Sequence, residues 1–180
     1  QSRLASDEGV YHVQAVFTIN HELDTGALRK AWSQVMRRHS ALRTSFWEDE
    51  TGQAFQLVWD LGEPSMDEQD WSGEPDCEQL LNDYLDKDRA RGFDLSDAPQ
   101  WRILLVKTAS AAYQMVWSSH HAIIDGWSIG LLLKDLASTY DALLHTNCRS
   151  VTPPPRPYRD YVSWLSAQDL NQTETFWRTY

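Results

Sequence analysis

Residues 116–130 read VWSSHHAIIDGWSIG, and this stretch decides the fold class. Its first part belongs to the apolar run AYQMVWSS, which is typical of a core strand. Its last part opens WSIGLLLKDLASTYDALLH, where apolar residues recur at helical spacing. Between the two lie His120 and His121, followed by Asp125 and Gly126. The pattern predicts a strand that runs through a polar turn into a helix packed across a sheet.

The segments on either side add further strands and helices in mixed order. Strands are expected at YHVQAVFTIN (11–20), at TSFW and AFQLVW as a hairpin (44–59), and at WRILLVKT (101–108). Helices are expected from Asp24 or Thr25 to about His39, over CEQLLNDYLDKDRARGF (77–93), and in YRDYVSWLSAQDL and TETFWRTY after residue 157. The acidic segment 62–76, broken by proline and glycine, is expected to be a surface loop.

This order of elements predicts one layered domain. Strands and helices that alternate without a strict repeat favour an α/β (α+β) two-layer sandwich, in which helices cover a mixed sheet. The segment VTPPPRP (151–157) carries four prolines and is expected to be a stiff extended connector before the terminal helices. We also expect a chain cut at both ends, because it starts at QSRLASDEG and ends at FWRTY inside a helical pattern.

Composition excludes several classes of function. A formal net charge of -10 argues against binding to a phosphate backbone, so nucleic acid is not an expected partner. No apolar run is long enough to span a membrane, and the start does not resemble a signal peptide. Cys77 and Cys148 have no spacing that suggests a disulfide framework or a zinc site. We therefore expect a cytoplasmic protein with no bound metal.

The polar turn carries the chemistry. Adjacent residues of an extended strand point to opposite faces, so only one of His120 and His121 can face a pocket. Asp125 can accept helix N–H groups, and the N–H of Gly126 can approach a ligand closely. A neutral imidazole can take a proton from an attacking amine or hydroxyl while helix N–H groups stabilise an oxyanion. This combination suits acyl transfer.

The residues alone leave a simpler interpretation open. A histidine pair at a strand end can be two polar side chains hydrogen-bonded in a half-buried turn, followed by an ordinary helix start. Likewise, Arg38, His39 and Arg43 can be basic residues that complement the C-terminal dipole of a helix. A metal site is disfavoured, because neighbouring histidines on opposite faces cannot chelate one ion without distortion.

Four motifs in order resemble one family. HHAIIDGWS resembles the HHxxxDG motif of nonribosomal peptide synthetase condensation domains, and RRHSALRTSF (37–46) resembles their upstream RHxxLRTxF motif. RGFDLSDAPQWRILL (91–105) and YRDYVSWLSAQ (158–168) resemble two further motifs of that family. The resemblance implies a lobe of chloramphenicol acetyltransferase type, with residues 1–180 forming the N-terminal lobe of a two-lobed domain whose tunnel lies between the lobes.

The resemblance also implies an activity and its partners. Aminoacyl or peptidyl groups would arrive as thioesters on the phosphopantetheine arms of upstream and downstream carrier domains, and a peptide bond would form between them. The domain itself would bind no cofactor. Its other partners would be its own C-terminal lobe and an adjacent adenylation domain.

Roles for single residues follow from the same resemblance. His121 would orient or deprotonate the attacking amine, and the N–H of Gly126 would contact the oxyanion or thioester. Asp125 would pair with a buried arginine, Arg43 or Arg38, and breaking a buried pair from one side costs about 3 to 5 kcal/mol. His120 would serve mainly packing and tautomer control.

Relatives that share the HHxxxDG array provide alternatives. An epimerization domain would exchange an α-proton, and an ester-forming acyltransferase would use acyl-CoA and an alcohol; DGWS, LRTSF and YRDYVSW favour condensation over both. A heterocyclization domain would lack the two histidines. A non-catalytic carrier-docking lobe is disfavoured because both histidines and Asp125 are present.

Overall fold

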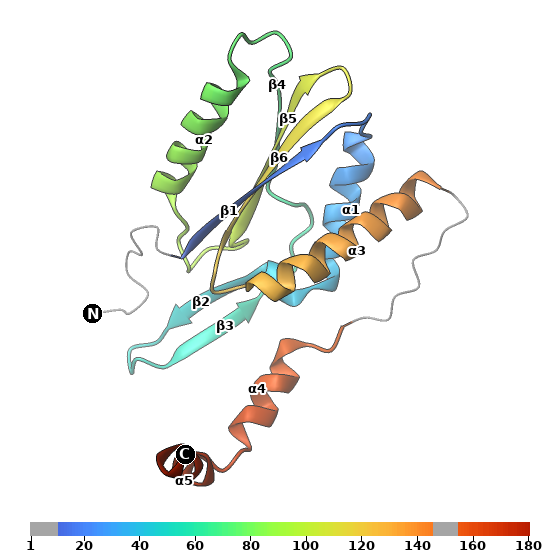
Figure 1. Cartoon of the computed structure of the whole chain (residues 1–180). Helices are drawn as coiled ribbons and strands as arrows, with labels where there is room; N and C mark the ends of the chain where they lie inside the picture. Colours follow the sequence, from blue (N-terminus) through green and yellow to red (C-terminus); the bar gives the residue numbers. More distant parts are fainter. Residues whose placement is uncertain (1–10, 146–154) are drawn as a thin grey trace.

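The computed structural model describes residues 11–145 and 155–180 (Figure 1). Secondary structure follows the predicted order closely. The elements are β1 His12–Ile19, α1 Thr25–Arg38, a 3-10 helix η1 Ser40–Arg43, β2 Thr44–Glu48, β3 Ala54–Val58, β4 Met66–Asp70, α2 Cys77–Arg91, β5 Trp101–Ala109, β6 Ala112–His120, α3 Gly126–Leu144, α4 Tyr158–Ser166 and α5 Leu170–Thr179.

The main sheet is mixed, as predicted. Its strands lie in the order β1-β6-β5-β4; β6 is antiparallel to both neighbours, and β4 is parallel to β5. β6, the strand that leads to the two histidines, is therefore central and has a hydrogen-bonding partner on each side. Its register aligns His120 with His12 of β1 and Ser119 with Trp101 of β5.

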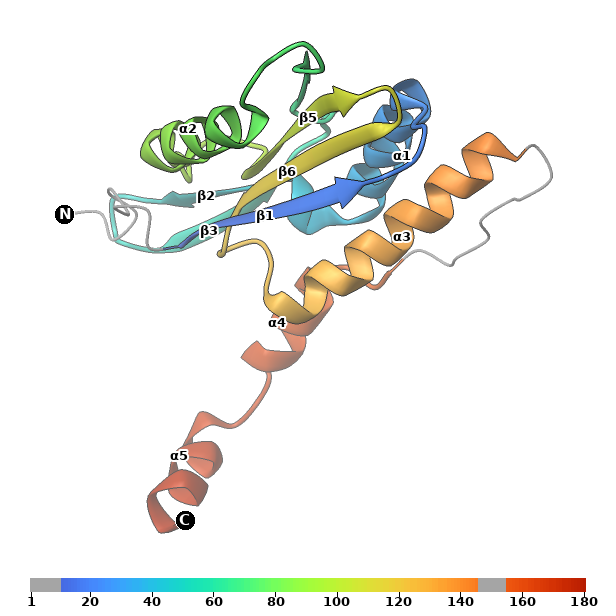
Figure 2. The same cartoon turned by 45° about the horizontal axis from the view of Figure 1, so that its top comes forward.

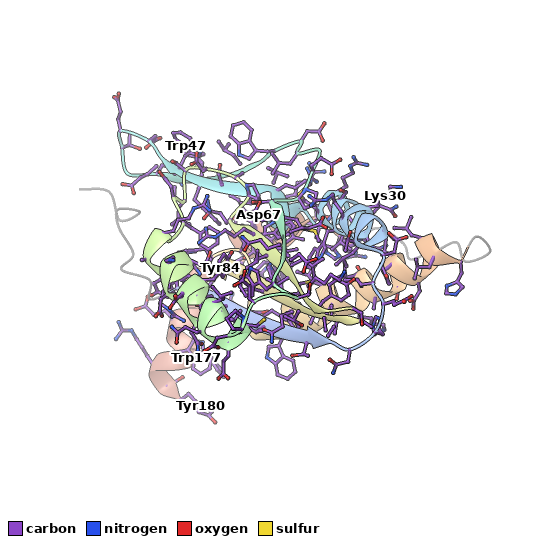
Figure 3. All side chains as sticks on the ribbon, turned by 90° about the horizontal axis from the view of Figure 1, so that it is seen from above. Lys30, Trp47, Asp67, Tyr84, Trp177 and Tyr180 are labelled. Carbon is purple, nitrogen blue, oxygen red and sulfur yellow. The ribbon has the colours of Figure 1, made fainter. Side chains whose placement is uncertain are left out.

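Helices cover both faces of this sheet, which adds a helical layer to the two layers expected from the sequence. α1 and α3 lie against one face and α2 against the other (Figures 1 and 2). The α1/α3 side holds the larger core, where Trp32 of α1 packs on Trp101 and Trp117 with ring centroids 5.2 and 5.8 Å apart. On the α2 side, Tyr84, labelled in Figure 3, packs with other α2 residues over a smaller apolar cluster.

Successive side chains of β6 point to opposite faces of the sheet. Tyr113, Met115 and Trp117 belong to the core on the α1/α3 side. Val116 belongs to the cluster under α2, and Ser118 contacts α2 directly. Because side chains alternate, His120 continues the α2 side of the strand.

The boundaries of α1 and α2 follow from the residues at their ends, and Asp24 starts the first helix as predicted. Asp24 is the N-cap of α1, where its side chain accepts a hydrogen bond from the N–H of Ala27 at 2.8 Å. Gly92 ends α2 with a φ of 60°, in the left-handed region that glycine tolerates best. Each helix therefore has a chemical reason for its boundary.

The prediction that residues 62–76 form a loop is wrong in part. β4, Met66–Asp70, lies inside this segment and pairs with β5 in parallel. Only Met66 of this strand is buried, so the sequence MDEQD shows no apolar alternation. The strand is held by main-chain hydrogen bonds to β5, which no local pattern reveals.

The predicted hairpin is present as a separate two-stranded sheet, β2 with β3. It carries exposed aromatic residues, among them Trp47, which lies at one edge of the molecule in Figure 3. Beyond α3, the last helices α4 and α5 extend away from the sheet and its covering helices (Figure 2).

Some predictions fall on parts of the chain that the structure does not describe. The proline-rich connector expected at 151–157 is described only from residue 155, and Pro157 has the extended φ of −60° and ψ of 141°. Cys77 is a free thiol, while Cys148 lies outside the described residues. In the described part of the chain, no helix is both long and apolar enough to cross a membrane.

Candidate active site

The turn from β6 into α3 is pinned by main-chain hydrogen bonds to both sides. The N–H of His120 donates to the carbonyl of Gln100 at 3.0 Å, and the N–H of His121 donates to the carbonyl of Tyr11 at 2.8 Å. A third bond, from the N–H of Ile123 to the carbonyl of His120 at 3.2 Å, closes the turn. The backbone that carries the two histidines is therefore fixed from the strands beside it.

The two imidazoles lie in different environments, as strand geometry predicts. His120 is buried, and its ring lies beside Tyr11 and Phe93 with centroid distances of 6.1 and 6.5 Å. Its Nδ1 accepts a hydrogen bond from the N–H of Ala122 at 3.1 Å. His121 is exposed and lines a pocket. Only His121 of this pair is placed to meet a ligand.

The pocket has a volume of about 590 Å³ and gathers segments that are far apart in the sequence. It lies where the end of α1, the hairpin, the β6–α3 turn, the first turns of α3 and the start of α4 come together. Its lining residues are His39, Ala41, Leu42, Phe46, Gln56, His121, Ala122, Ile123, Ile124, Asp125, Ser128, Leu131, Leu132, Pro155 and Tyr158. Apolar walls with a few polar groups are typical of a site for a small organic substrate.

Asp125 caps the helix that starts in this pocket. Its Oδ1 accepts hydrogen bonds from the N–H of Ser128 at 2.8 Å and from the Ser128 hydroxyl at 2.6 Å. The Ser128 hydroxyl and N–H together hold the pKa of the Asp125 carboxyl below its usual range. Asp125 is therefore an anion at neutral pH and anchors the first turn of α3.

The predicted pairing of Asp125 with Arg43 or Arg38 is not the one that the structure contains. Arg43 donates to the carbonyls of Met36 and Arg37 at the C-terminal end of α1 and to the carbonyl of Trp59, which follows β3. Arg38 forms an ion pair with Asp135 of α3, with 3.3 Å between Nε and Oδ2. The physical reason is that each group has hydrogen-bond partners elsewhere. The exposed Asp125 accepts hydrogen bonds from Ser128 in its own helix turn, and the Arg43 guanidinium donates to main-chain carbonyls.

Gly126 is the first residue of α3, and its surroundings are open. A Cβ placed on this residue would meet no atom of the described chain within 4 Å. The first N–H groups of a helix have no carbonyl partner inside the helix, and Asp125 takes that of Ser128. The N–H groups of Gly126 and Trp127 likewise have no carbonyl partner within α3, although neither residue lines the pocket.

Sequence reasoning gave no place in the pocket to two residues that the structure brings there. His39 lines the pocket, and its Nε2 lies 2.7 Å from Oδ2 of Asp135. His39 belongs to the motif RRHSALRTSF, so the motif could have marked it as a site residue. Asp135, the partner of His39, lies 96 positions further along the chain and is not marked by any local pattern. The bond between Ser128 and Asp125 could have been predicted, because an N-cap aspartate accepts a hydrogen bond from the main-chain N–H three residues later. Among the described residues, no group of three or more His, Cys, Asp or Glu side chains could hold a metal ion.

Comparison with known proteins adds a family to this geometry. Residues 2–180 match the family described as Condensation domain. One polypeptide of the linear gramicidin synthase of Brevibacillus parabrevis is 37% identical over 179 residues, which are 98% of this chain and 2% of that protein. Surfactin synthase subunit 3 of Bacillus subtilis (strain 168) is 31% identical over 175 residues, 96% of this chain and 14% of that protein.

Solved structures agree on the fold. The first condensation domain of the calcium-dependent antibiotic synthetase, in complex with a substrate analogue, superposes with a TM-score of 0.72 at 24% identity, over 82% of this chain and 35% of that one. The starter condensation domain of rhizomide synthetase gives 0.73 at 21% identity, over 81% and 36%. The chain thus spans 35% and 36% of these two solved chains, and a far smaller share of the two synthases above.

Proposed function

This chain belongs to the condensation domain family, and we propose that it takes part in forming a peptide bond between aminoacyl or peptidyl thioesters held on carrier proteins. The family membership confirms the resemblance drawn from the four sequence motifs. The names of its relatives, synthases of gramicidin and surfactin, support a peptide product over an ester.

The position of His121 supports this proposal most directly. Its side chain is exposed to a pocket of about 590 Å³, while the backbone that carries it is fixed by the bond to Tyr11. Beside it in the pocket, Asp125 is the N-cap of α3, whose first main-chain N–H groups have no carbonyl partner within the helix. An imidazole can orient or deprotonate an attacking amine, and N–H donors can stabilise the thioester carbonyl oxygen under attack.

The reaction can be balanced with these groups. The acceptor amine nitrogen attacks the donor carbonyl carbon, a C–N bond forms and the C–S bond breaks. The amine gives up one proton, and the departing thiolate gains one. His121 would hold the amine or carry that proton, and the N–H groups of Gly126 and Trp127 would stabilise the carbonyl oxygen as it becomes negative. Asp125 would keep the α3 N-terminus in place.

We further propose that residues 1–180 correspond to the N-terminal lobe of a two-lobed domain. Support comes from the solved condensation domains, of which the chain spans 35% and 36%. A second lobe would then form the opposite wall of the pocket, and upstream and downstream carrier domains would deliver substrates on phosphopantetheine arms. An adjacent adenylation domain is a further proposed partner. A cytoplasmic location stays a prediction.

The test uses the full-length natural protein, with donor and acceptor aminoacyl carrier proteins, and follows products by mass spectrometry. A parallel reaction offers acyl-CoA and a long-chain alcohol. We expect a dipeptidyl thioester in the first reaction, and a loss of about 100-fold or more on His121→Ala. His21→Ala, an exposed histidine outside the pocket, is the matched control and should keep full activity.

Other outcomes would support other functions. Ester without dipeptide would indicate an acyl-CoA-dependent acyltransferase. Exchange of an α-proton on a carrier-bound peptide, without condensation, would indicate an epimerization domain. Carrier binding without any product would indicate a docking role.

A further inference from the structure

His39 is a second imidazole in the pocket that holds His121, and it comes from a different part of the chain. It is the C-cap residue of α1, where its main-chain N–H donates to the carbonyl of Val35 at 3.0 Å. Its side chain is 21% exposed, and it lines the pocket. The end of α1 and the β6–α3 turn therefore each contribute one histidine to the same space.

Asp135 holds the His39 ring from outside the pocket. Its Oδ2 lies 2.7 Å from Nε2 of His39, and it does not itself line the pocket. The same oxygen also lies 3.3 Å from Nε of Arg38. A carboxylate accepts hydrogen bonds only, so the proton in the contact with His39 is on Nε2. Asp135 thus sets the orientation and the tautomer of the ring.

Nδ1 is the ring nitrogen that this contact leaves for a ligand. With the proton on Nε2, a neutral His39 carries a lone pair on Nδ1 and can accept a hydrogen bond there. In the described part of the chain, no residue forms a hydrogen bond with Nδ1 of His39. An N–H donor suits this position because the Nδ1 lone pair accepts a hydrogen bond. The donor group can carry a positive charge, because the Asp135 carboxylate on the other side of the ring favours one.

We propose that His39, oriented by Asp135, binds the amine of the acceptor substrate through Nδ1. This inference rests on the proposed condensation reaction, in which the acceptor amine is the substrate group that carries N–H bonds at the reacting centre. His39 would hold the amine in place, and of the two roles proposed for His121 this leaves it the transfer of the proton. Asp135 acts through His39 and is a positioning residue.

A purely structural function for the same contact must be separated from this one. His39, Arg38 and Asp135 also tie the end of α1 to α3, and losing that tie could lower activity by loosening the pocket. Two substitutions test the two ring nitrogens separately. His39→Gln places an amide near the position of Nε2, so it keeps a donor for Asp135 and loses Nδ1. His39→Asn places a polar atom near Nδ1 and is too short to reach Asp135.

The experiment measures steady-state condensation by the full-length protein with a saturating donor carrier and a varied aminoacyl acceptor. We expect His39→Gln to lower kcat/KM for the acceptor by about 10- to 100-fold, the range for loss of a hydrogen bond to a charged group, with an unchanged KM for the donor. His39→Asn should retain more activity than His39→Gln. Asp135→Asn should lower the same parameter to a smaller extent, and Arg38→Gln, which leaves the His39 contact in place, should have little effect.

The results separate the possibilities. Denaturation midpoints of all variants identify any that fail to fold. Among the folded variants, the order of kcat/KM for His39→Gln and His39→Asn then distinguishes amine binding from a structural tie. If His39→Gln behaves as wild type while His39→Asn or Arg38→Gln loses activity, the contact is a structural tie and the inference is wrong. If the wild-type protein forms no dipeptide, the condensation proposal and this inference both fail. If it forms dipeptide and both His39 variants are unimpaired, only this inference fails.

Discussion

Ser118 on β6 donates a hydrogen bond to Asp88 on α2, with 2.6 Å between Oγ and Oδ2. The same carboxylate accepts from Gln14 at 2.7 Å and contacts Nε2 of His12 at 3.0 Å, while Arg102 pairs with its other oxygen. Asp88 therefore joins α2 to β1, β5 and β6 at one buried point. Ser118 lies two residues before His120, so this point supports the strand end that leads into the pocket.

Substitution of Asp88 should be among the most destabilising changes in the chain. Asp88→Ala leaves Arg102 buried without its partner, which costs about 3 to 5 kcal/mol. Ser118→Ala removes one hydrogen bond of the same carboxylate and should cost about 1 kcal/mol. Urea denaturation followed by tryptophan fluorescence measures both. Equal effects of the two substitutions would mean that the ion pair with Arg102 contributes little.

The same cluster should make stability depend on pH. Burial lowers the pKa of His12 below its ordinary 6.5 although Asp88 opposes the shift, because Arg102 already balances the carboxylate. The unfolded chain then binds more protons than the folded one, so stability falls as pH falls below 6.5. His12→Gln keeps a donor for Asp88 and should flatten the dependence between pH 7 and pH 5. Denaturation at several pH values in that interval tests this, and parallel curves for wild type and variant would contradict it.

Asp88 should act in a lower pH window. Burial opposes its charge, but hydrogen bonds from Ser118, Arg102 and Gln14 outweigh burial and keep the pKa of Asp88 below its ordinary 3.8. Its contribution is complete above pH 3.8 and is lost as pH falls through the lower folded value. The wild-type protein should therefore lose stability below pH 4 more steeply than Asp88→Asn.

Local patterns predicted the elements whose apolar residues repeat along the chain. β6 and α3 have such a repeat, and the turn between them follows from a strand end and a helix cap. β4 escaped prediction because only Met66 is buried and its pairing partner, β5, lies more than 30 residues away. The partner of Asp125 was also predicted wrongly. Similarity to a motif marks a residue as part of a site, but it does not show which hydrogen bond the side chain of that residue forms.

The pocket was partly predictable. Strand alternation alone implied that one histidine faces packing and the other a cavity, and His120 and His121 lie in this way. The contact of His39 with Asp135 joins residues 96 positions apart and depends on how α1 packs on α3. Such a contact appears only when the helices are placed in three dimensions.

Asp125 should behave as a helix cap and not as a member of a buried ion pair. Asp125→Ala removes the acceptor for Ser128 and should cost about 1 kcal/mol. Asp125→Ser keeps a capping oxygen and should be nearly as stable as wild type. Denaturation of both variants checks the stabilities. A loss of about 3 kcal/mol or more on Asp125→Ala would indicate a buried partner.

Substitution of His120 should mainly lower stability, and substitution of His121 should mainly lower activity. His121 is exposed, so His121→Ala should change the free energy of unfolding by less than about 0.5 kcal/mol. His120 is buried beside Tyr11 and Phe93, and His120→Ala should cost about 1 to 3 kcal/mol. Thermal unfolding of both variants, measured together with dipeptide formation, tests the division. A strongly destabilised His121→Ala variant would show that its side chain is structural.

Gly126 and Gly130 form a matched pair for testing the α3 N-terminus. Both belong to α3, and a Cβ added to either would meet no atom of the described chain within 4 Å. Gly130 lies in the helix interior, beyond the first-turn N–H groups that we propose to contact the substrate, so Gly130→Ala should stabilise the protein by up to about 1 kcal/mol with unchanged activity. Gly126→Ala should also fold normally, because nothing in the described chain obstructs the methyl group.

The two alanine variants should nevertheless differ in turnover. The methyl group at position 126 would stand beside the N–H groups that we propose to stabilise the carbonyl oxygen, and a poorly placed oxygen loses that stabilisation. We expect Gly126→Ala to lower kcat by about 10-fold or more while Gly130→Ala retains the wild-type value. Because both substitutions put the same methyl group on the same helix, a difference between them reports the approach of the substrate. Wild-type turnover in both would mean that the thioester does not approach the first turn of α3.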